Sequence, residues 1–338
     1  MPCVSVLLPC YNAERTLPEA LDSLQRQSLA DFEIVAVEDG STDGTLALLK
    51  DWARREPRLR LLAQPHAGLV AALNAGLEAC GAPLVARMDA DDRAYPQRLA
   101  RQLQYLDAHP QLAAVGCLVR GFPPEALGEG FRLYIEWLNA LLTDADMRRD
   151  LFIESPLAHP SVMFRREWVT RLGGYQDHGW PEDYDLWMRL SLAGGQLGKV
   201  PELLLDWRAG PQRLTNTDSR YALENFLRLK AHYLKQGPLA GRETVFIWGA
   251  GMAGRRLSKH LLAQGAPLQA FFDVDARKVG RTRRGLPVLP GSVLPEWWAR
   301  CPKPVLLAAV RVRGARPIVR RRLEGYGLKE GQDWWCVE

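Results

Sequence analysis

An acidic motif, Met88-Asp89-Ala90-Asp91-Asp92, directly follows an apolar stretch that we expect to form a β-strand. Residues i and i+2 of an extended backbone point to the same side, so the carboxylates of Asp89 and Asp91 can converge on one cation. Carboxylate oxygens suit Mg²⁺ or Mn²⁺, and these ions keep coordination positions open for the phosphate oxygens of a substrate. The alternative is a solvated acidic turn in which Asp92 caps a helix, and the short motif alone favours that alternative.

Polar residues also follow two other predicted strands. Pro9-Cys10-Tyr11-Asn12 comes at the end of the first strand, and Asp39 opens the turn DGSTDGT after the second. In open α/β sheets the ligand crevice lies outside the carboxyl ends of the strands, so these ends would bring Tyr11, Asp39 and the Asp89/Asp91 pair together. Taken singly, such residues can be ordinary turn or helix-cap residues. Their occurrence at three strand ends favours a shared site.

The elements that position these residues alternate between short apolar strands and amphipathic helices over the first 120 residues. This pattern is typical of β-α-β units around a mostly parallel sheet. Phe131, Tyr134 and Trp137 share one face of a later helix, an arrangement more typical of core packing than of a sugar platform or a membrane contact. Strands are predicted at residues 4–8, 33–37, 59–62, 84–88, 113–118 and 200–205, and helices at 17–24, 69–79, 97–108, 131–142, 183–192 and 221–235.

The β-α-β pattern restarts after a linker-like stretch, QGPLAGR, at residues 236–242. Three glycines, Gly249, Gly251 and Gly254, follow the first strand of this part and open its first helix, and Asp273 follows about twenty residues later. Glycines at this place let a ligand approach the backbone closely, and a helix N-terminus attracts phosphate. The motif predicts a Rossmann-like fold and indicates NAD only weakly. Strands are predicted here at residues 244–248, 269–272 and 305–310, and helices at 253–263 and 316–326.

Three stretches of the first part, PCYNAERTLPEALDSLQRQ, EIVAVEDGSTDGT and LNAGLEACGAPLVARMDADD, resemble the family-2 nucleotide-sugar glycosyltransferases of the GT-A fold. The likeness continues through His159-Pro160-Ser161, Gly173-Gly174-Tyr175 and residues 181–187, in the order and spacing of the family. It covers roughly residues 3–210. It implies an α/β protein with a GT-A domain over residues 1–240, a mostly parallel sheet flanked by helices, followed by a small Rossmann-like α/β domain over residues 243–338.

The resemblance also implies roles for individual residues. Asp91, with Asp89, would ligate the metal ion that binds the donor diphosphate, and Asp183, beside Glu182, would be the catalytic base. The alternative for Glu182 and Asp183 is a pair of first-turn acids that the helix dipole favours. Two features depart from the family pattern, because no histidine follows the last core strand and Leu73 stands where relatives often have arginine. The residues implied in binding the donor nucleotide are Pro9, Tyr11, Asn12, Asp39, Asp89 and Arg208.

These residue types fit a metal-dependent, inverting transfer of a sugar from a nucleotide diphosphate donor, which we expect to be a UDP-sugar, to a hydroxyl of a cell-surface glycan precursor. A carboxylate can take the proton of the attacking hydroxyl by general-base catalysis. A bound Mn²⁺ or Mg²⁺ offsets the charge that develops on the departing phosphate oxygens. The expected partners are therefore a nucleotide-sugar donor and a glycan or lipid-linked glycan acceptor.

The second part resembles another family. The stretch FIWGAGMAGRRLSKHLLAQG, followed by AFFDVDARKVGRTRRGLPVLP, is similar to the small N-terminal Rossmann-like domain of bacterial sugar O-acyltransferases. In that family the domain can hold a nucleotide-sugar, so the resemblance implies a nucleotide or nucleotide-sugar at the glycine loop. An alternative function follows, a nucleotide-sugar or dinucleotide-binding sensor or oxidoreductase that acts through this domain. The intact Asp89, Asp91 and Asp183 argue against that alternative.

The composition is that of an ordinary globular protein, with 338 residues, 47% hydrophobic and 25% charged. A net charge of +5 is too small to indicate a nucleic-acid partner. The charge is divided unevenly, with −4 over residues 1–242 and +9, from 17 Lys/Arg against 8 Asp/Glu, over residues 243–338. The basic runs at residues 277–284 and 311–322 fit a solvated face better than contact with lipid head groups.

Other features bear on location. The six cysteines lack paired or metal-type spacing, no apolar run is long enough for a membrane span, and no signal peptide is evident at the start. These features predict a cytoplasmic protein with reduced thiols, in at most peripheral contact with the inner face of the membrane. The sequence carries no signal for the oligomeric state.

Overall fold

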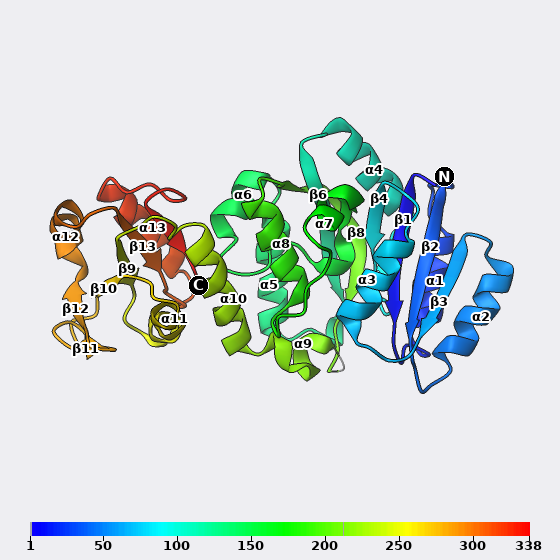
Figure 1. Cartoon of the computed structure of the whole chain (residues 1–338), viewed down its shortest axis with the longest axis horizontal. Helices are drawn as coiled ribbons and strands as arrows, with labels where there is room; N and C mark the ends of the chain where they lie inside the picture. The colour runs from blue at the N-terminus through cyan, green and yellow to red at the C-terminus, as the bar shows by residue number, and fades with distance from the viewer. Residues whose placement is uncertain (1, 212) are drawn as a thin grey trace. The chain divides into compact units, whose positions relative to one another are not determined.

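The structure, a computed structural model, describes residues 2–211 and 213–338 and divides into two compact units (Figure 1). The first runs from the N-terminus to Met147 and includes Pro156–His178 and Glu182–Thr217. The second comprises Arg148–Ser155, Gly179–Pro181 and Asp218–Glu338. Helix α10 (Leu223–Gln236) belongs to the second unit, where it packs against α11 (Met252–Ala263). The assignment of residues 1–240 and 243–338 to two functional domains stays a prediction.

The first unit is built on one sheet with the strand order β3-β2-β1-β4-β7-β6-β8-β5. Strands β1, β2, β3 and β4 run parallel, with Cys10 beside Glu38 and Leu7 beside Arg87. Their carboxyl ends therefore lie at the same edge of the sheet. The strands are β1 (Val4–Cys10), β2 (Phe32–Asp39), β3 (Leu59–Gln64), β4 (Leu84–Arg87), β5 (Arg93–Ala94), β6 (Leu112–Phe122), β7 (Met163–Arg165) and β8 (Gln196–Arg208).

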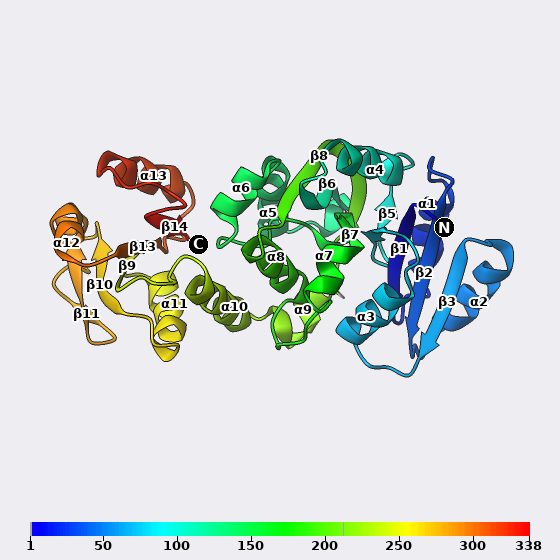
Figure 2. The same cartoon turned by 45° about the horizontal axis from the view of Figure 1, so that its top comes forward.

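Helices cover both faces of this sheet, as the predicted α/β class requires. Alternate residues of β1 face opposite layers: Val6 and Leu8 pack with α1 and α4, whereas Leu7 packs with α3 and α8. Helix α2 lies beside β3 (Figure 2). The helices are α1 (Leu17–Gln25), α2 (Thr45–Arg55), α3 (Leu69–Ala79), α4 (Arg98–Ala108), α5 (Glu129–Ala140), α7 (Arg166–Arg171), α8 (Glu182–Leu192) and α9 (Leu214–Thr217). A further helix, α6 (Asp144–Asp150), begins in this unit, and its residues from Arg148 on belong to the second.

The aromatic face of α5 packs against the core of the first unit. Phe131, Tyr134 and Trp137 are partly buried, and the ring centroid of Phe131 lies 5.0 Å from that of Trp207 in β8. Tyr134 lies 6.1 Å from the same Trp207 ring. The prediction of core packing is therefore confirmed.

The second unit has its own sheet, in the order β11-β12-β10-β9-β13-β14. All neighbouring strands run parallel except β11 and β12, which are antiparallel. The order β12-β10-β9-β13-β14, with the first strand of the unit at the centre, is that of a Rossmann-type sheet. The predicted second α/β domain is thus present. Its elements are β9 (Thr244–Trp248), α11, β10 (Leu268–Asp273), β11 (Thr282–Arg283), β12 (Leu286–Pro290), α12 (Leu294–Arg300), β13 (Pro304–Ala308), α13 (Ala315–Gly325) and β14 (Trp334–Cys336).

The cysteines and the helices bear on two further predictions. All six cysteines are free thiols, and Cys10, Cys80, Cys117 and Cys336 are buried. Among the described residues, no helix is both long enough and apolar enough to cross a membrane.

Candidate active site

Tyr11 and a histidine, His66, form an exposed aromatic pair at the carboxyl ends of β1 and β3. Their ring centroids are 4.1 Å apart and their planes differ by 21°, so the rings are stacked. His66 Nδ1 lies 2.9 Å from the carboxylate of Asp39, the last residue of β2. The structure thus brings Tyr11 and Asp39 to one place, as predicted, and adds His66, which no motif in the sequence indicates. Pro9 is buried in β1 just before this turn.

The buried carboxylate of Asp39 holds the turn that carries His66. Asp39 Oδ1 accepts hydrogen bonds from Gln64 Nε2 at 2.6 Å and from the Ala67 amide at 3.0 Å, and Oδ2 accepts from the Gly68 amide at 2.9 Å. Buried carboxylates need such donors, because desolvation without them is costly. Asp39 therefore fixes the turn that places His66 beside Tyr11. A direct hydrogen bond between Asp39 and a nucleotide base stays a prediction.

Asn12 joins the turns after β1 and β2. Its side-chain oxygen accepts a hydrogen bond from the Thr42 amide at 2.8 Å, and its own amide donates to Ser41 Oγ at 3.0 Å. Its φ of 48° is a left-handed conformation that asparagine tolerates. In this structure Asn12 fixes loop geometry, and its predicted contact with the donor stays a prediction.

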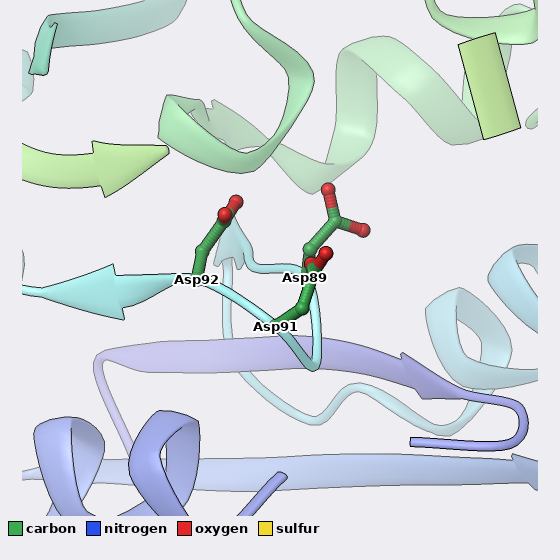
Figure 3. Close-up of side chains that lie close together, drawn as sticks. All are labelled: Asp89, Asp91 and Asp92. Atoms are coloured by element: carbon green, nitrogen blue, oxygen red, sulfur yellow. The ribbon is translucent and has the colours of Figure 1, made fainter. Parts of the chain in front are cut away.

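Three carboxylates gather in the turn between β4 and β5. Oxygens of Asp89, Asp91 and Asp92 all lie within 4.8 Å of one another (Figure 3). Burial and the charge of Asp89 raise the pKa of Asp91 to about 6. Burial and the two neighbouring carboxylates raise the pKa of Asp92 well above its usual value. Close like charges of this kind are costly unless a cation lies among them.

Asp92 is the clearest indication that the triad fits a cation. It is buried, and its Oδ1 accepts a hydrogen bond from the Arg208 amide at 2.7 Å. Its Oδ2 is also buried and has no hydrogen-bond partner among the described residues. Buried carboxylate oxygens normally have a partner, so an unpaired one beside two other carboxylates suits a hard divalent ion. The solvated-turn alternative does not fit Asp92, because that residue is not solvated.

A buried arginine, Arg87, lies behind the triad. The last residue of β4, it forms an ion pair with Asp89 and is 2% exposed. Burial works against its charge, but the nearby Asp89 and Glu182 outweigh this effect and raise the pKa of the Arg87 guanidinium. Arg87 therefore provides a fixed positive charge between the acidic turn and the start of α8.

Arg208, at the end of β8, is held within the site by several contacts. Its Nε donates to the Asp91 carbonyl at 2.6 Å, and its guanidinium pairs with Glu19. The same group lies 4.4 Å from the ring centroid of Phe122. Arg208 thus holds the acidic turn through hydrogen bonds, and its contact with a diphosphate stays a prediction.

Of the three acids at the start of α8, Asp183 alone is partly exposed. Glu182 and Asp185 are buried, at 1% and 0% exposed, and Asp185 accepts a hydrogen bond from Arg189 Nε at 2.7 Å. One oxygen of Asp183 accepts from the Tyr184 amide at 2.7 Å, which fixes the side chain at the helix start. This exposure leaves Asp183 accessible, whereas Glu182 is enclosed. The role of Asp183 as catalytic base, beside Glu182, stays a prediction.

A buried polar chain backs Glu182. His159 Nδ1 lies 3.8 Å from Glu182 Oε1, and His159 Nε2 lies 2.9 Å from the Tyr175 hydroxyl. Burial and the charge of Arg87 hold the pKa of His159 well below its usual value, so the imidazole is neutral. We assign the Nδ1 proton toward Glu182, so that the Tyr175 hydroxyl donates to Nε2. The backbone of Tyr175 is held in turn by Asn74, through two hydrogen bonds of 2.9 Å.

The glycine loop of the second unit has the predicted form. Gly249 follows β9, Gly251 caps the N-terminus of α11 and Gly254 lies within its first turn. Asp273, at the end of β10, accepts a hydrogen bond from the Ala250 amide at 2.8 Å. Asp273 therefore fixes the loop itself.

Comparisons with known proteins identify the family of this chain. The family model described as "Glycosyl transferase family 2" matches residues 5–173. The amylovoran biosynthesis glycosyltransferase AmsE of Erwinia amylovora is 34% identical over 248 residues, which cover 72% of this chain and 89% of AmsE. This chain belongs to glycosyl transferase family 2. It is a glycosyltransferase, as the sequence analysis predicted.

Other relatives agree with this assignment. A relative from Escherichia coli, UDP-Gal:alpha-D-GlcNAc-diphosphoundecaprenol beta-1,3-galactosyltransferase, is 29% identical over 69% of this chain and 82% of its own length. The structure of S. aureus TarS 1-349 in complex with UDP-GlcNAc matches 70% of this chain and 67% of that 1-349 chain, with a TM-score of 0.57 and 19% identity. The mannosyltransferase PcManGT of Pyrobaculum calidifontis, in complex with GDP-Man and Mn2+, matches 70% of this chain and 62% of its own, with a TM-score of 0.52 and 24% identity. These structures confirm the GT-A fold of the first unit.

Proposed function

We propose that this glycosyltransferase moves a sugar from a UDP-sugar to a hydroxyl of a cell-surface glycan precursor, with Mn²⁺ or Mg²⁺ and with inversion at the anomeric carbon. The observation that carries the proposal is the acidic triad at the sheet edge that also carries the Tyr11–His66 pair. The buried Asp92 Oδ2 of this triad has no hydrogen-bond partner in the part of the chain that the structure describes. Ligands of open α/β sheets bind at this edge.

The donor would bind across the carboxyl ends of β1, β2 and β4. The stacked Tyr11 and His66 offer a flat, partly exposed surface that suits a nucleotide base. Asp89 and Asp91 would hold the metal ion, with Asp92 completing the set of carboxylates. When bound, the ion would supply Lewis-acid stabilisation of the diphosphate that leaves the sugar.

Asp183 would serve as the general base. Its carboxylate would take the proton of the acceptor hydroxyl while that oxygen forms a bond to the anomeric carbon, and the bond from this carbon to the diphosphate oxygen breaks. A single displacement of this kind inverts the configuration at the anomeric carbon. Glu182, His159 and Tyr175 would hold the start of α8 in position, and the rigid placement of a base contributes strongly to rate.

The relatives support the choice of substrates. The E. coli relative is named for a UDP-Gal donor and a diphosphoundecaprenol-linked acceptor, and AmsE is named for the biosynthesis of amylovoran. We therefore propose a UDP donor and a glycan or lipid-linked glycan acceptor for this chain. A lipid-linked acceptor would bring the enzyme to a membrane surface, in line with the expected peripheral contact.

The test is a panel of nucleotide-sugars assayed for hydrolysis and transfer, with Mn²⁺, with Mg²⁺ and with EDTA. We expect turnover of a UDP-sugar with either ion and none with EDTA. Asp183→Asn should lower kcat by about 100-fold or more, the scale of a lost general base. Asp22→Asn, an exposed aspartate in α1, is the matched control and should keep full activity. Undiminished turnover in EDTA, or in Asp183→Asn, would refute the corresponding part of the proposal.

A further inference from the structure

The most exposed large apolar side chains among the described residues gather on the second unit. Four of them are more than half exposed to solvent, from 56% for Ile318 to 71% for Val312. All four line one cavity of about 550 Å³; they are Met252, Val274, Val312 and Ile318. Large apolar side chains that gather on a surface are a common sign of an interaction site.

These side chains come from four separate segments that the fold brings together. Met252 begins α11 after β9, Val274 follows β10, Val312 follows β13 and Ile318 lies in α13. Strands β9, β10 and β13 are parallel neighbours, so the segments that follow them lie at one edge of the sheet. The exposed apolar side chains are therefore concentrated at this edge and are not scattered over the unit.

Helix α13 has a buried side and an exposed side. Val319 and Leu323, four positions apart, are 7% and 0% exposed and attach the helix to the unit. Ile318 and Arg322, also four positions apart, are exposed and both line the cavity. Residues with this spacing lie on the same side of a helix. The outer side of α13 therefore presents an isoleucine and an arginine together.

Arginines accompany the exposed apolar side chains. Residues 311–322, RVRGARPIVRRR, hold six arginines and no acidic residue. The two aspartates that line the cavity are offset by one lysine, because Lys278 Nζ lies 3.1 Å from Asp273 and 3.6 Å from Asp275. One further acid, Glu338, lines the cavity. Three of the arginines that line it make no ion pair within residues 2–211 and 213–338; they are Arg256, Arg311 and Arg322.

We propose that these four apolar side chains and three arginines form an arginine–apolar face that binds the surface of an anionic phospholipid membrane. The apolar side chains would enter the boundary between head groups and acyl chains, and the guanidinium groups would contact lipid phosphates. A soluble polyanion would use the arginines but would leave the apolar side chains in water. On sequence alone the basic runs fit a solvated face better, because the exposed apolar side chains become evident only in the fold.

The test is co-sedimentation of the full chain with vesicles of phosphatidylcholine, with and without phosphatidylglycerol. EDTA is present, so that no divalent ion bridges the acidic triad to lipid phosphates. We expect binding to the mixed vesicles, binding weaker by about tenfold or more to phosphatidylcholine alone, and weaker binding at high salt, because salt screens surface charges. Donor and acceptor are both absent, so a failure of the transferase proposal leaves this measurement unaffected.

Two double variants address the two components of the face. Arg311→Gln/Arg322→Gln removes two cations, each worth about fivefold in affinity for an anionic surface, and should weaken binding by roughly 25-fold. Val312→Ser/Ile318→Ser should weaken it by about tenfold or more, because less apolar area leaves water on binding. All four side chains are exposed, so the unfolding temperature should not change.

Matched controls make the same chemical changes on the first unit. Arg26→Gln/Arg54→Gln lowers the net charge equally at two exposed arginines, and Leu192→Ser removes an apolar side chain that is 41% exposed. Both controls should bind the mixed vesicles as the wild type does. The comparison separates the arginine–apolar face from an effect of net charge or of surface hydrophobicity.

Four results would overturn the proposal: no binding to the mixed vesicles, equal binding to phosphatidylcholine alone, unchanged binding in either face variant, or the same loss in the controls. Two other occupants of the face are tested in parallel, UDP by calorimetry in EDTA and a second copy of the chain by analytical ultracentrifugation. UDP binding or self-association that the face variants abolish, without vesicle binding, would assign the face to that occupant and also overturn the proposal.

Discussion

Tyr175→Phe tests the buried chain that backs the proposed base. The substitution removes only the hydroxyl that contacts His159 Nε2 at 2.9 Å, and both residues are buried. A buried polar atom that loses its partner costs about 1–3 kcal/mol of folding stability. For a folding unit of roughly 150–250 residues, a loss of about 2 kcal/mol lowers the unfolding temperature by about 4–8 °C.

The kinetic effect should fall on kcat. His159 contacts Glu182, the residue that precedes Asp183 in α8. The substitution does not involve the stacked Tyr11–His66 pair. We therefore expect kcat to fall by about 10- to 100-fold, the scale of a small misplacement of a catalytic group, with the KM for the donor unchanged. Steady-state kinetics over a range of donor concentrations separates the two parameters.

A double-mutant cycle with His159→Leu isolates the pair. Because the double variant leaves neither polar group unpaired, its loss of stability should be smaller than the sum of the single losses by about 1 kcal/mol. Tyr105→Phe is the matched control, since that tyrosine also lies beside a histidine, with ring centroids 4.3 Å apart, and it should change stability by less than about 0.5 kcal/mol. If Tyr175→Phe behaved like this control, or if the coupling were zero, the hydrogen-bonded chain would not support the base.

Three other predictions concern the metal site, the turn beside the Tyr11–His66 pair and a buried lysine. Mn²⁺ at about 100 times its Kd should stabilise the wild type by about 2.7 kcal/mol, and Asp92→Asn should lose most of this gain in a thermal melt; an equal gain in the variant would argue against Asp92 as part of the metal site. Gly40→Ala should weaken the binding of UDP, because Gly40 has a φ of +69° and a Cβ there would lie 2.4 Å from the His66 backbone nitrogen. An unchanged affinity for UDP in calorimetry would show that this turn does not contribute to nucleotide binding. Burial lowers the pKa of Lys199 to about 7, so the unfolded chain binds more protons than the folded chain between pH 7 and 10.5, the ordinary pKa of a lysine side chain. Stability should therefore rise across this window by about 1.4 kcal/mol per pH unit more than in Lys199→Met, as urea unfolding at several pH values would show, and parallel curves would refute it.

Much of the site could be predicted from single strands. Parallel strands end at a common edge, so residues placed just after β1, β2 and β4 identify Tyr11, Asp39 and the acidic motif without any tertiary information. The helix at residues 69–79 has the predicted bounds, because its apolar spacing is regular and Gly68 precedes it. These features depend on local sequence alone.

Other parts depend on contacts between distant segments. Asn74 and Tyr175 are 101 positions apart, and His66 is 27 positions from Asp39, so no local pattern links them. Arg87 appears in sequence as an ordinary strand residue, and its burial becomes evident only when α8 is placed. The predicted strand at residues 200–205 extends over 196–208, because irregular register with β6 accommodates Pro201 and Glu202. The sequence does not predict the short strands β12 and β14. Strand β12 contains two prolines, and β14 has only three residues.

The turn beyond β3 has a consequence for engineering the enzyme. Asp39 holds this turn largely through the amides of Ala67 and Gly68, which any residue could supply at position 67, whereas the φ of +89° at Gly68 favours glycine. Exchange of the His66 side chain removes its own contact with Asp39 but leaves these two amide hydrogen bonds in place to hold the turn. On the proposed function, a library varied at this one position would explore nucleotide preference separately from the acidic turn and from α8.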